Sequence, residues 1–580
     1  MSGSSNGIEL PQEFLERMKL QLGDEYNAFI ESYDKEAYRG LRINRFKVRE
    51  REENGIFSAL CKEKGAAALG GDEHKGTASK LDGSVCGFED AISSIPWTET
   101  GYYYEEELKP GRNPLFDAGA YYIQEPSAMT PAELIDICPG YRVLDLCAAP
   151  GGKSTRLAER LFLADKRRDL AEDDPGRACN DADRRAGSRG EISRERGFLI
   201  ANEYVNSRAR ILASNIERLG ISNTVVLNES PDSLEEKFAG FFDAVLVDAP
   251  CSGEGMFRKN PETIQEWSIQ NVEHCARRQR DILRSAYKML KPGGCMIYST
   301  CTFAPQENDE NVSWFCGVYP DMELVNEEHI YPHRAGGEGH FVAKLLKSGS
   351  SLYDAEYADL NNDMGCGGSS RVVDSSKKND GKKGKGKKGK SNGENRKSAT
   401  DIKDACKAFF EFEKEYLKIS LSDKDGRFEL FGDRLFLVPR GMPSLEGIKC
   451  VCPGLELGTF KKNRFEPAHA LSMHLAPSDA KICFELGNLA GSYIRGEVIE
   501  AGAYIHGEQS VSTDETEADC DLRIMPGFIG ADGKYVETTD DAKTGWALMC
   551  VDGISVGWGK YVDGRIKNHY PKGLRRFYAF

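Results

Sequence analysis

The 580-residue chain is 40% hydrophobic and 29% charged, and it carries a formal net charge of −15. This length exceeds one ordinary hydrophobic core, so two to four domains of a soluble globular protein are expected. No run approaches the roughly 18 apolar residues that span a bilayer. No basic segment leads into an apolar core near the N-terminus. We therefore expect a cytoplasmic protein and exclude the membrane-embedded and secreted classes.

The cysteines and the charge pattern bear on possible ligands. Seventeen cysteines scattered over the chain fit a reducing cytosol in which most thiols are buried. No pair of C-x-x-C motifs at zinc spacing appears, and the lone C-x-C at residues 450–452 is a weak candidate, so no metal site is expected. The acidic total hides a local excess of about +8 over residues 377–397, against about −23 elsewhere. An RNA partner is therefore not excluded, because it needs only a local basic surface.

Residues 1–130 are expected to form a small α+β domain. Two short helices are predicted over residues 10–33, where Phe14 and Met18 recur at helical spacing. Residues 58–84 are rich in Gly, Ala and Lys and have few large apolar side chains, which predicts a surface insertion.

Residues 131–350 alternate apolar strands with helical patterns, which indicates a parallel sheet covered by helices. The predicted strands are residues 142–146, 197–202, 223–227, 244–247 and 295–299, and the predicted helices include residues 205–219 and 272–290. Residues 165–196 are almost entirely charged, Gly and Ala, so we predict a solvated loop inserted into this domain.

A flexible linker is predicted over residues 365–400, which are mainly Gly, Ser, Lys and Asn. Apolar and aromatic content returns over residues 402–580, which predicts a separate and mostly β module. A helix over residues 403–417 should precede it, and residues 429–438 and 546–557 are its clearest strand candidates.

The first predicted strand of the central domain runs into a turn of small residues and then a helix, through Cys147, Ala148, Ala149, Pro150, Gly151, Gly152 and Lys153. Small residues let a ligand approach the backbone, and helix N-terminal amides donate hydrogen bonds. The turn is therefore a candidate site for a nucleotide-like cofactor. A tight turn without a ligand is the alternative. It is not a P-loop, because Gly151 and Gly152 are adjacent.

Polar and thiol side chains follow the later strands of the same sheet. Glu203 ends the second strand and can accept hydrogen bonds from both hydroxyls of a ribose. Asp248 and Cys251 follow the strand at 244–247, and Cys301 follows the strand at 295–299. A single cysteine at a strand end is more often an inert core residue. Two that meet an aspartate near a cofactor site indicate nucleophilic chemistry.

These segments closely resemble the Sun/Nop family of RNA cytosine-5 methyltransferases, and within it the bacterial RsmF-type ribosomal RNA enzymes. The resemblance covers nearly the whole chain. Its most specific part is the pairing of DAPCSGEG at residues 248–255 with YSTCT at residues 298–302. Further matching segments are residues 10–11, 39–44, 117–128, 292–294, 306–312, 553–558 and 567–571.

The resemblance implies a Rossmann-like methyltransferase sheet domain that binds S-adenosylmethionine, with RNA-binding domains at residues 1–130 and 402–580. Many members carry an aspartate near the adenine where this chain has Asn-Glu-Ser-Pro at residues 228–231, so Ser230 is expected there. The implied cofactor-binding residues are Cys147, Ala148, Ala149, Pro150, Gly151, Gly152, Lys153, Glu203, Ser230 and Asp248. The implied catalytic residues are Cys301, Cys251, Asp248 and Lys153.

The chemistry of such enzymes explains the need for two thiols. Carbon 5 of cytosine is a poor nucleophile, but a thiolate that adds to carbon 6 turns the ring into an enamine whose carbon 5 can attack. The resemblance assigns this attack to Cys301, and Cys251 would assist the later expulsion of that thiolate. A protonated Asp248 at ring nitrogen 3 would stabilise the adduct. The target base must leave its stack to enter the pocket.

Three functions are weighed. Methylation of ribosomal RNA is the leading hypothesis, and transfer RNA is the alternative substrate. A non-catalytic RNA-binding assembly factor on the same scaffold is the alternative of a different class. Such a factor could lose Lys153, Asp248 or either cysteine at no cost, whereas this chain has them all. The Lys-rich linker is expected to be a spacer, or a weak and salt-sensitive contact to phosphates.

Overall fold

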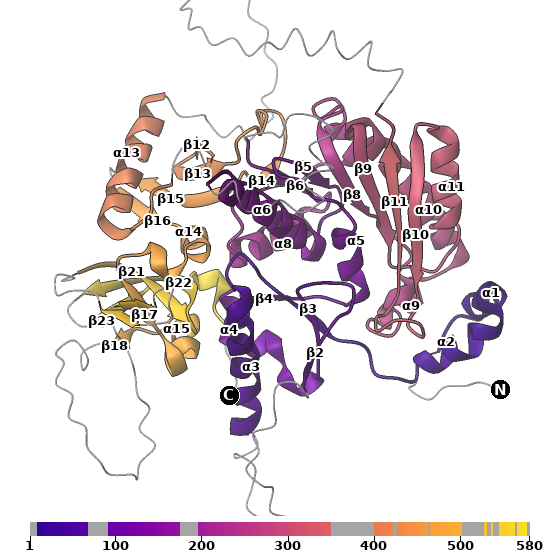
Figure 1. Ribbon diagram of the computed structural model, residues 1–580, viewed down its shortest axis with the longest axis horizontal. Coiled ribbons are helices and arrows are strands. Elements are labelled where there is room, and N and C mark those ends of the chain that lie inside the picture. Colours follow the sequence, from indigo (N-terminus) through magenta and orange to yellow (C-terminus); the bar gives the residue numbers. More distant parts are fainter. Residues whose placement is uncertain are drawn as a thin grey trace, which may run out of the picture.

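The computed structural model describes residues 9–67, 91–173, 195–349, 399–421, 426–461, 464–500, 527–529, 535–537, 544–562 and 565–576. Figure 1 shows a central sheet with helices on its faces, a smaller N-terminal sheet below it and the C-terminal elements to its left. No helix among the described residues has the length and apolar character needed to cross a bilayer. All but the last two positions of the predicted linker lie outside the described residues.

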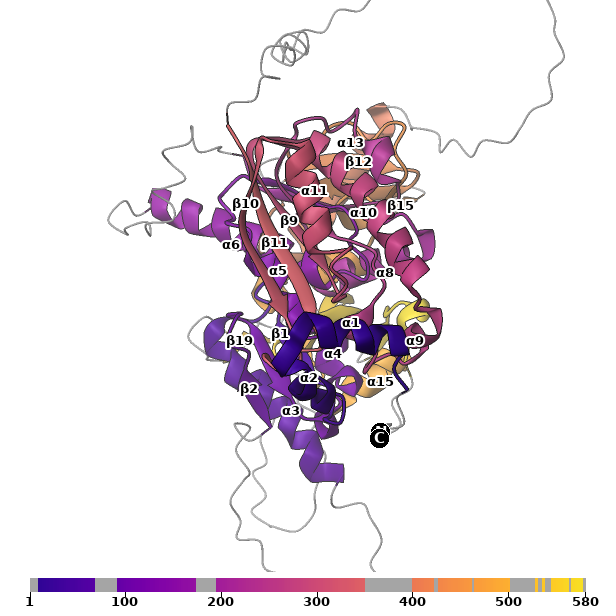
Figure 2. The same ribbon diagram turned by 90° about the vertical axis from the view of Figure 1, so that its right-hand side faces the viewer.

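The predicted pair of N-terminal helices is confirmed as α1 (Gln12–Leu22) and α2 (Tyr26–Ser32). Phe14 and Met18 are fully buried, but not against the N-terminal sheet. They belong to a cluster with residues of the central domain, namely Phe257, Trp267, Val272, Phe303 and Tyr331. Figures 1 and 2 both show α1 and α2 beside α9 (Glu262–Glu266), below one end of the central sheet. The two helices therefore brace the central domain.

The N-terminal sheet has four antiparallel strands in the order β2-β3-β1-β4. Its elements are β1 (Gly40–Ile43), α3 (Glu53–Ala67), β2 (Ile92–Ser94), β3 (Gly101–Tyr104), α4 (Pro114–Asp117), β4 (Tyr121–Ile123) and α5 (Thr130–Glu133). The predicted insertion over residues 58–84 is wrong at its start, because α3 continues through it to Ala67. Ile56, Phe57 and Leu60 are buried on one face of α3. Residues 68–90 lie outside the described part.

The central sheet has the strand order β10-β11-β9-β8-β5-β6-β7-β14. Its five predicted strands are confirmed as β5 (Arg142–Asp145), β6 (Phe198–Asn202), β7 (Thr224–Leu227), β8 (Phe242–Asp248) and β9 (Leu290–Thr300). These five are parallel, and β10 (Met322–Ile330) and β11 (His340–Lys347) add an antiparallel hairpin. The strand order reverses between β5 and β8. In sheets of this class ligands bind at the carboxyl edge beside such a reversal.

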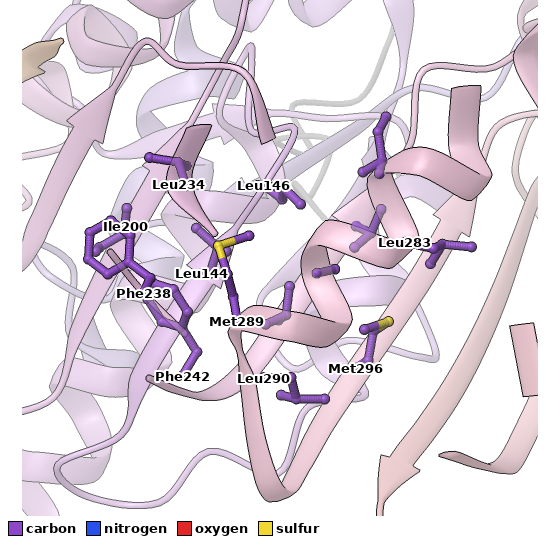
Figure 3. Packing of buried hydrophobic residues seen from close by; sticks show 14 of the residues in the cluster. Leu144, Leu146, Ile200, Leu234, Phe238, Phe242, Leu283, Met289, Leu290 and Met296 are labelled. Atoms are coloured by element: carbon purple, nitrogen blue, oxygen red, sulfur yellow. The ribbon is translucent and has the colours of Figure 1, made fainter. Parts of the chain in front are cut away.

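Long helices cover the central sheet: α6 (Gly152–Asp173), α8 (Asn206–Arg218), α10 (Ile269–Met289) and α11 (Asp309–Val318). The predicted helices at residues 205–219 and 272–290 are thus confirmed as α8 and α10. Figure 3 shows part of the core, where Leu283 and Met289 of α10 lie near Leu144 of β5 and Met296 of β9. These side chains are almost completely excluded from water, and burial of each contributes about 1.5–3 kcal/mol.

The predicted loop over residues 165–196 is wrong at its beginning, because α6 continues to Asp173. The buried Asp165 carboxylate accepts hydrogen bonds from the backbone N–H groups of Gly140 (2.8 Å) and Gly197 (2.7 Å). These bonds satisfy a carboxylate that would otherwise be costly inside the fold. Residues 174–194 lie outside the described part.

The C-terminal region begins with α13 (Ala399–Tyr416), which confirms the predicted helix. Two sheets follow, with the orders β12-β13-β15-β16 and β17-β21-β22-β23-β18. The first contains β12 (Arg427–Phe431), β13 (Arg434–Val438), β15 (Leu455–Lys461) and β16 (Arg464–Pro467). The second contains β17 (Cys483–Glu485), β18 (Ile499–Glu500), β21 (Thr544–Val551), β22 (Ile554–Val562) and β23 (Arg565–Asn568). The remaining elements are α14 (His469–His474), α15 (Ala490–Arg495) and the hairpin of β19 (Gly527–Ile529) and β20 (Tyr535–Glu537).

Two predicted strands of this region are wrong in extent, because each is a hairpin. Residues 429–438 turn at Gly432, and residues 546–557 turn at Asp552 and Gly553, all three of which have positive φ. One strand lies apart from both C-terminal sheets. β14 (Cys450–Cys452) pairs antiparallel with β7 and forms an edge of the central sheet.

A buried ion network joins the N-terminal and central domains. Arg42 of β1 is about 2% exposed and donates to Glu159 Oε2 (3.0 Å), Thr155 Oγ1 (2.6 Å) and the Gly152 carbonyl (3.2 Å). The other Glu159 oxygen accepts from Arg156 at 2.7 Å. The N-terminal sheet is thereby tied to the first turns of α6.

Replacing Arg42 by Met should lower the free energy of unfolding by about 3–5 kcal/mol, because it leaves Glu159 buried with one partner fewer. Urea denaturation measures this loss. The control is Arg39→Met, which removes exposed ion pairs with Glu36 and Glu106 and should cost less than about 1 kcal/mol. Equal decreases in the free energy of unfolding of the two variants would show that the buried network stabilises the fold no more than exposed ion pairs do.

Candidate active site

A cavity of about 990 Å³ opens at the carboxyl edge of the central sheet, beside the reversal of strand order. Tyr122, Gln124 and Glu125 of the N-terminal domain close one side of it. The predicted site residues that line it are Cys147, Ala148, Ala149, Pro150, Gly152, Lys153, Glu203, Ser230, Asp248, Cys251 and Cys301. Gly151 does not line it. Gly151 has a φ of 115°, a backbone conformation that residues with a side chain rarely adopt, so this position of the turn favours glycine.

Hydrogen bonds to main-chain atoms fix the turn between β5 and α6. The Ala148 N–H donates to the Asn202 carbonyl (2.9 Å), and Arg208 donates to the Ala149 carbonyl (2.8 Å). Asp145, at the end of β5, is fully buried and accepts from Ser154 Oγ at 2.6 Å. Burial raises the pKa of Asp145 to about 7. The turn therefore presents its backbone to the cavity from a fixed position.

Glu203 and Ser230 lie on the same side of the cavity, after β6 and β7. Glu203 Oε1 accepts from the Val205 N–H at 2.8 Å, while Oε2 lies 3.6 Å from the Arg208 guanidinium. A carboxylate has about four acceptor positions. Glu203 therefore retains acceptor capacity for a ligand.

The two predicted thiols meet. Cys251 Sγ lies 3.1 Å from Cys301 Sγ and also accepts from the Cys301 N–H at 3.4 Å. The hydrogen bond with Cys301, together with burial, raises the pKa of the Cys251 thiol well above its usual range. Either thiol can donate the hydrogen bond between the two sulfurs. A thiolate is the nucleophilic form of cysteine, and the remaining thiol of such a pair can stabilise it by donating this hydrogen bond.

Side chains behind the thiols hold their two loops together. Ser252 Oγ and Thr302 Oγ1 are 2.8 Å apart. The fully buried Glu254 carboxylate accepts from the Phe303 N–H (3.0 Å), from Trp267 Nε1 (2.8 Å) and from Arg17 of α1 (2.6 Å). The N-terminal helices therefore reach the framework that positions both cysteines.

Asp248 is ionised here, which corrects the expected protonated carboxyl. Burial alone raises the pKa of Asp248, but the adjacent Lys153 ammonium outweighs it and holds the pKa well below its usual range. Lys153 Nζ lies 2.8 Å from Asp248 Oδ2, and Ser299 Oγ donates to Oδ1 at 2.9 Å. An ammonium this close to a partly buried carboxylate favours its charged form.

Sequence reasoning missed two buried residues of the site. His340, the first residue of β11, lines the cavity. Glu307 lies behind Cys251, where its Oε2 accepts from the Ser252 N–H (3.1 Å) and from Gln279 (2.7 Å). No motif separates a lone histidine or glutamate from an ordinary side chain. The glycines before His340 were the available signal, since they mark a tight turn at a strand start.

No group of three or more His, Cys, Asp or Glu side chains within the described residues is arranged to hold a metal ion.

Four family models match successive parts of the chain. The model described as 16S rRNA methyltransferase RsmB/F matches residues 189–346. The N-terminal domain of 16S rRNA methyltransferase RsmF matches residues 10–64 and 51–126. The RsmF rRNA methyltransferase first C-terminal domain matches residues 411–475, and the Methyltransferase RsmF PUA domain matches residues 531–576.

Curated relatives carry corresponding names. A Ribosomal RNA small subunit methyltransferase F of Pectobacterium atrosepticum is 35% identical over 283 residues, and the match spans 45% of this chain and only 52% of that protein. A protein of the same name from Vibrio vulnificus is 26% identical over 596 residues, covering 98% of both chains. Among solved structures, a methyltransferase homolog protein from Pyrococcus horikoshii has a TM-score of 0.40 and 24% identity, over 58% of this chain and all of that one.

Glu307 predicts a pH-dependent loss of stability. Burial raises the pKa of Glu307 from 4.5 to about 7, so the folded protein binds a proton more tightly than the unfolded chain between these values. The wild type should therefore lose stability as pH rises from about 4.5 to 7, by at most about 3 kcal/mol from this group. Glu307→Gln lacks the titrating group and should not share this loss. Thermal denaturation at several pH values tests the difference, with the exposed Glu310→Gln as control. Parallel curves for Glu307→Gln and wild type would contradict the prediction.

Proposed function

The chain belongs to the RsmB/F methyltransferase family, and from that premise we propose that it transfers a methyl group from S-adenosylmethionine to carbon 5 of a cytosine in ribosomal RNA. The observation that carries the proposal is the pair of thiols, Cys251 and Cys301, with their sulfurs 3.1 Å apart in one cavity with Asp248 and Lys153. A protein or small-molecule methyltransferase would need neither thiol. A non-catalytic RNA-binding factor would need neither the thiols nor the ion pair.

The cavity suits S-adenosylmethionine in its chemistry. The turn from Cys147 to Lys153 presents backbone at the start of α6, as sites for nucleotide-like cofactors do. The free acceptor capacity of Glu203 would hold the ribose hydroxyls, and Ser230 would lie by the adenine. The cofactor supplies the electrophilic methyl group.

The residues of this chain then have separate tasks. The Cys301 thiolate adds to carbon 6 of the flipped base, and carbon 5 gains the nucleophilic character needed to take the methyl group. Carbon 5 afterwards gives its proton to a water molecule, the electrons of that C–H bond restore the double bond between carbons 5 and 6, and the ring expels Cys301 as a thiolate. The protonated Cys251 donates a hydrogen bond to the departing sulfur and so stabilises the thiolate. Lys153 keeps Asp248 ionised beside the base.

The RNA would be held by the domains on either side of the cavity. We assign RNA binding to residues 1–130 and 402–580, and catalysis to residues 131–350. The names of the relatives favour ribosomal over transfer RNA as substrate. Thiolate chemistry needs a reducing compartment, which supports action in the cytoplasm. Bisulfite sequencing of RNA from cells with and without the gene would identify the modified nucleotide.

Loss of the Glu203 carboxylate should weaken cofactor binding. Hydrogen bonds to a charged group contribute about 1.5–3 kcal/mol, so Glu203→Ala should raise the Kd for S-adenosylmethionine about 10- to 100-fold. Isothermal titration calorimetry measures this Kd. Glu203→Gln keeps an acceptor for the Val205 N–H and controls for folding, and Glu236→Ala alters an exposed glutamate outside the cavity. Undiminished affinity in both Glu203 variants would remove this residue from the cofactor site.

Variants that lack one of the two cysteines should stop at different steps of the reaction. Cys301→Ala can form no bond to the base, so it should be inactive and give no protein–RNA adduct. Cys251→Ala should still attack and transfer the methyl group, but should stall with the RNA attached through Cys301. A denaturing gel with labelled RNA should show a slow-migrating band for Cys251→Ala alone, and only with S-adenosylmethionine present.

The control for this experiment is Cys295→Ala, which removes a thiol from β9, the strand that leads to Cys301, and should methylate normally. A band from Cys301→Ala instead would mean that the roles of the two thiols are reversed. Two active mutants without any band would overturn the covalent mechanism.

A further inference from the structure

The chemistry above leaves a buried polar atom of His340 unused. His340 is only about 3% exposed and lines the cavity. Its Nε2 has no hydrogen-bond partner among the described residues and lies 3.7 Å from Asp248 Oδ1, beyond hydrogen-bond distance. A buried ring nitrogen without a partner costs free energy unless a ligand satisfies it.

The position of His340 is fixed by close backbone packing. Gly339 has a φ of 129°, and a Cβ atom there would clash with the Phe303 ring. A Cβ on Gly255 would lie 2.7 Å from the Gly339 carbonyl, and the Gly255 N–H donates to the Cys301 carbonyl at 2.9 Å. The turn before His340 thus packs directly against the loops of both thiols.

The N-terminal domain holds the same turn from the other side. The Glu338 N–H donates to Glu125 (2.8 Å), and the Gly339 N–H donates to Ser127 Oγ (3.3 Å). The Glu338 carboxylate in turn accepts from Arg258 at 2.7 Å. His340 therefore enters the cavity from a rigid support, as a recognition residue requires.

The ring is a neutral hydrogen-bond donor on the side that faces Asp248. Burial and the nearby Lys153 ammonium lower the pKa of His340 below its usual value. A neutral imidazole carries one N–H, and the negative Asp248 favours that hydrogen on Nε2. Asp248 Oδ1 accepts one bond, from Ser299, in the described structure, so it has acceptor capacity left. An acceptor and a donor thus lie side by side.

We propose that His340 and Asp248 together read the target base: His340 Nε2–H donates to ring nitrogen 3 of cytosine, and Asp248 accepts from its exocyclic amino group. This inference rests on the proposed function and deepens it by naming the residue that selects cytosine. Uracil presents an N–H at position 3 and a carbonyl at position 4, so both contacts would oppose it. A site built from such paired contacts rejects the wrong partner strongly.

The same contact also assists the reaction. When Cys301 adds to carbon 6, electron density moves onto nitrogen 3, and the hydrogen bond from His340 strengthens as that charge develops. No proton needs to leave the imidazole. His340 thereby supplies the stabilisation that the ionised Asp248 cannot provide.

The test compares His340→Phe, which keeps a planar ring without its nitrogens, with His340→Gln, which restores an N–H donor. His329→Phe, a histidine outside the cavity, is the matched control. Unmodified small-subunit ribosomal RNA transcribed in vitro is the substrate, and the same transcript with uridine at the methylated position measures selectivity. Initial methylation rates, the Kd for S-adenosylmethionine and the melting temperature are recorded for each protein.

His340→Phe should methylate the cytosine transcript about 100-fold more slowly than the wild type. The ratio of its rates on the cytosine and uridine transcripts should be at least about tenfold smaller than in the wild type. Its Kd for the cofactor and its melting temperature should match the wild type, and His340→Gln should recover much of the rate. An unchanged rate and preference in His340→Phe would overturn the inference. A loss accompanied by weaker cofactor binding or a lower melting temperature would also overturn it, since that result marks a structural role. A wild type that methylates neither transcript would instead overturn the proposed function, and the inference with it.

Discussion

The Lys153–Asp248 ion pair is the contact on which the arrangement of the site depends. Lys153 begins α6, beside the turn proposed to hold the cofactor, and Asp248 ends β8, beside the loop of Cys251. Lys153 is buried, and its charge would be costly there without the Asp248 carboxylate beside it, so the pair holds the two segments together. The turn proposed to hold the cofactor and the loop of Cys251 are thereby kept at a set separation. Such preorganisation is what makes a contact effective in a transition state.

The support for this pair comes from parts of the chain far away in sequence. Arg17 of α1 bonds to Glu254, Arg42 of β1 bonds to the start of α6, and Glu125 bonds to the turn before His340. All three come from the first 130 residues, which were expected only to bind RNA. The N-terminal domain is therefore part of the framework that positions the site residues.

The sequence predicted the strands, the long helices and the meeting of Cys251 with Cys301, because parallel strands deliver their carboxyl ends to one edge. It failed where a long-range contact decides the outcome. Asp165 was expected to be exposed to solvent. It is buried instead, and its carboxylate accepts hydrogen bonds from two backbone N–H groups of other segments. Asp248 was expected to be protonated, since its motif does not reveal the nearby ammonium of Lys153. His340 was missed because only the folded structure shows that it lines the cavity beside Asp248.

The pairing of β14 with β7 has a consequence for how this protein can be divided. Residues 450–452 reach back from beyond the linker and cover the hydrogen-bonding edge of the central sheet. Cutting the chain at the linker would leave β7 with unpaired N–H and C=O groups, which invite pairing with other molecules. The central domain is thus not a self-contained module. Exchange of the C-terminal region between relatives must carry a compatible edge strand.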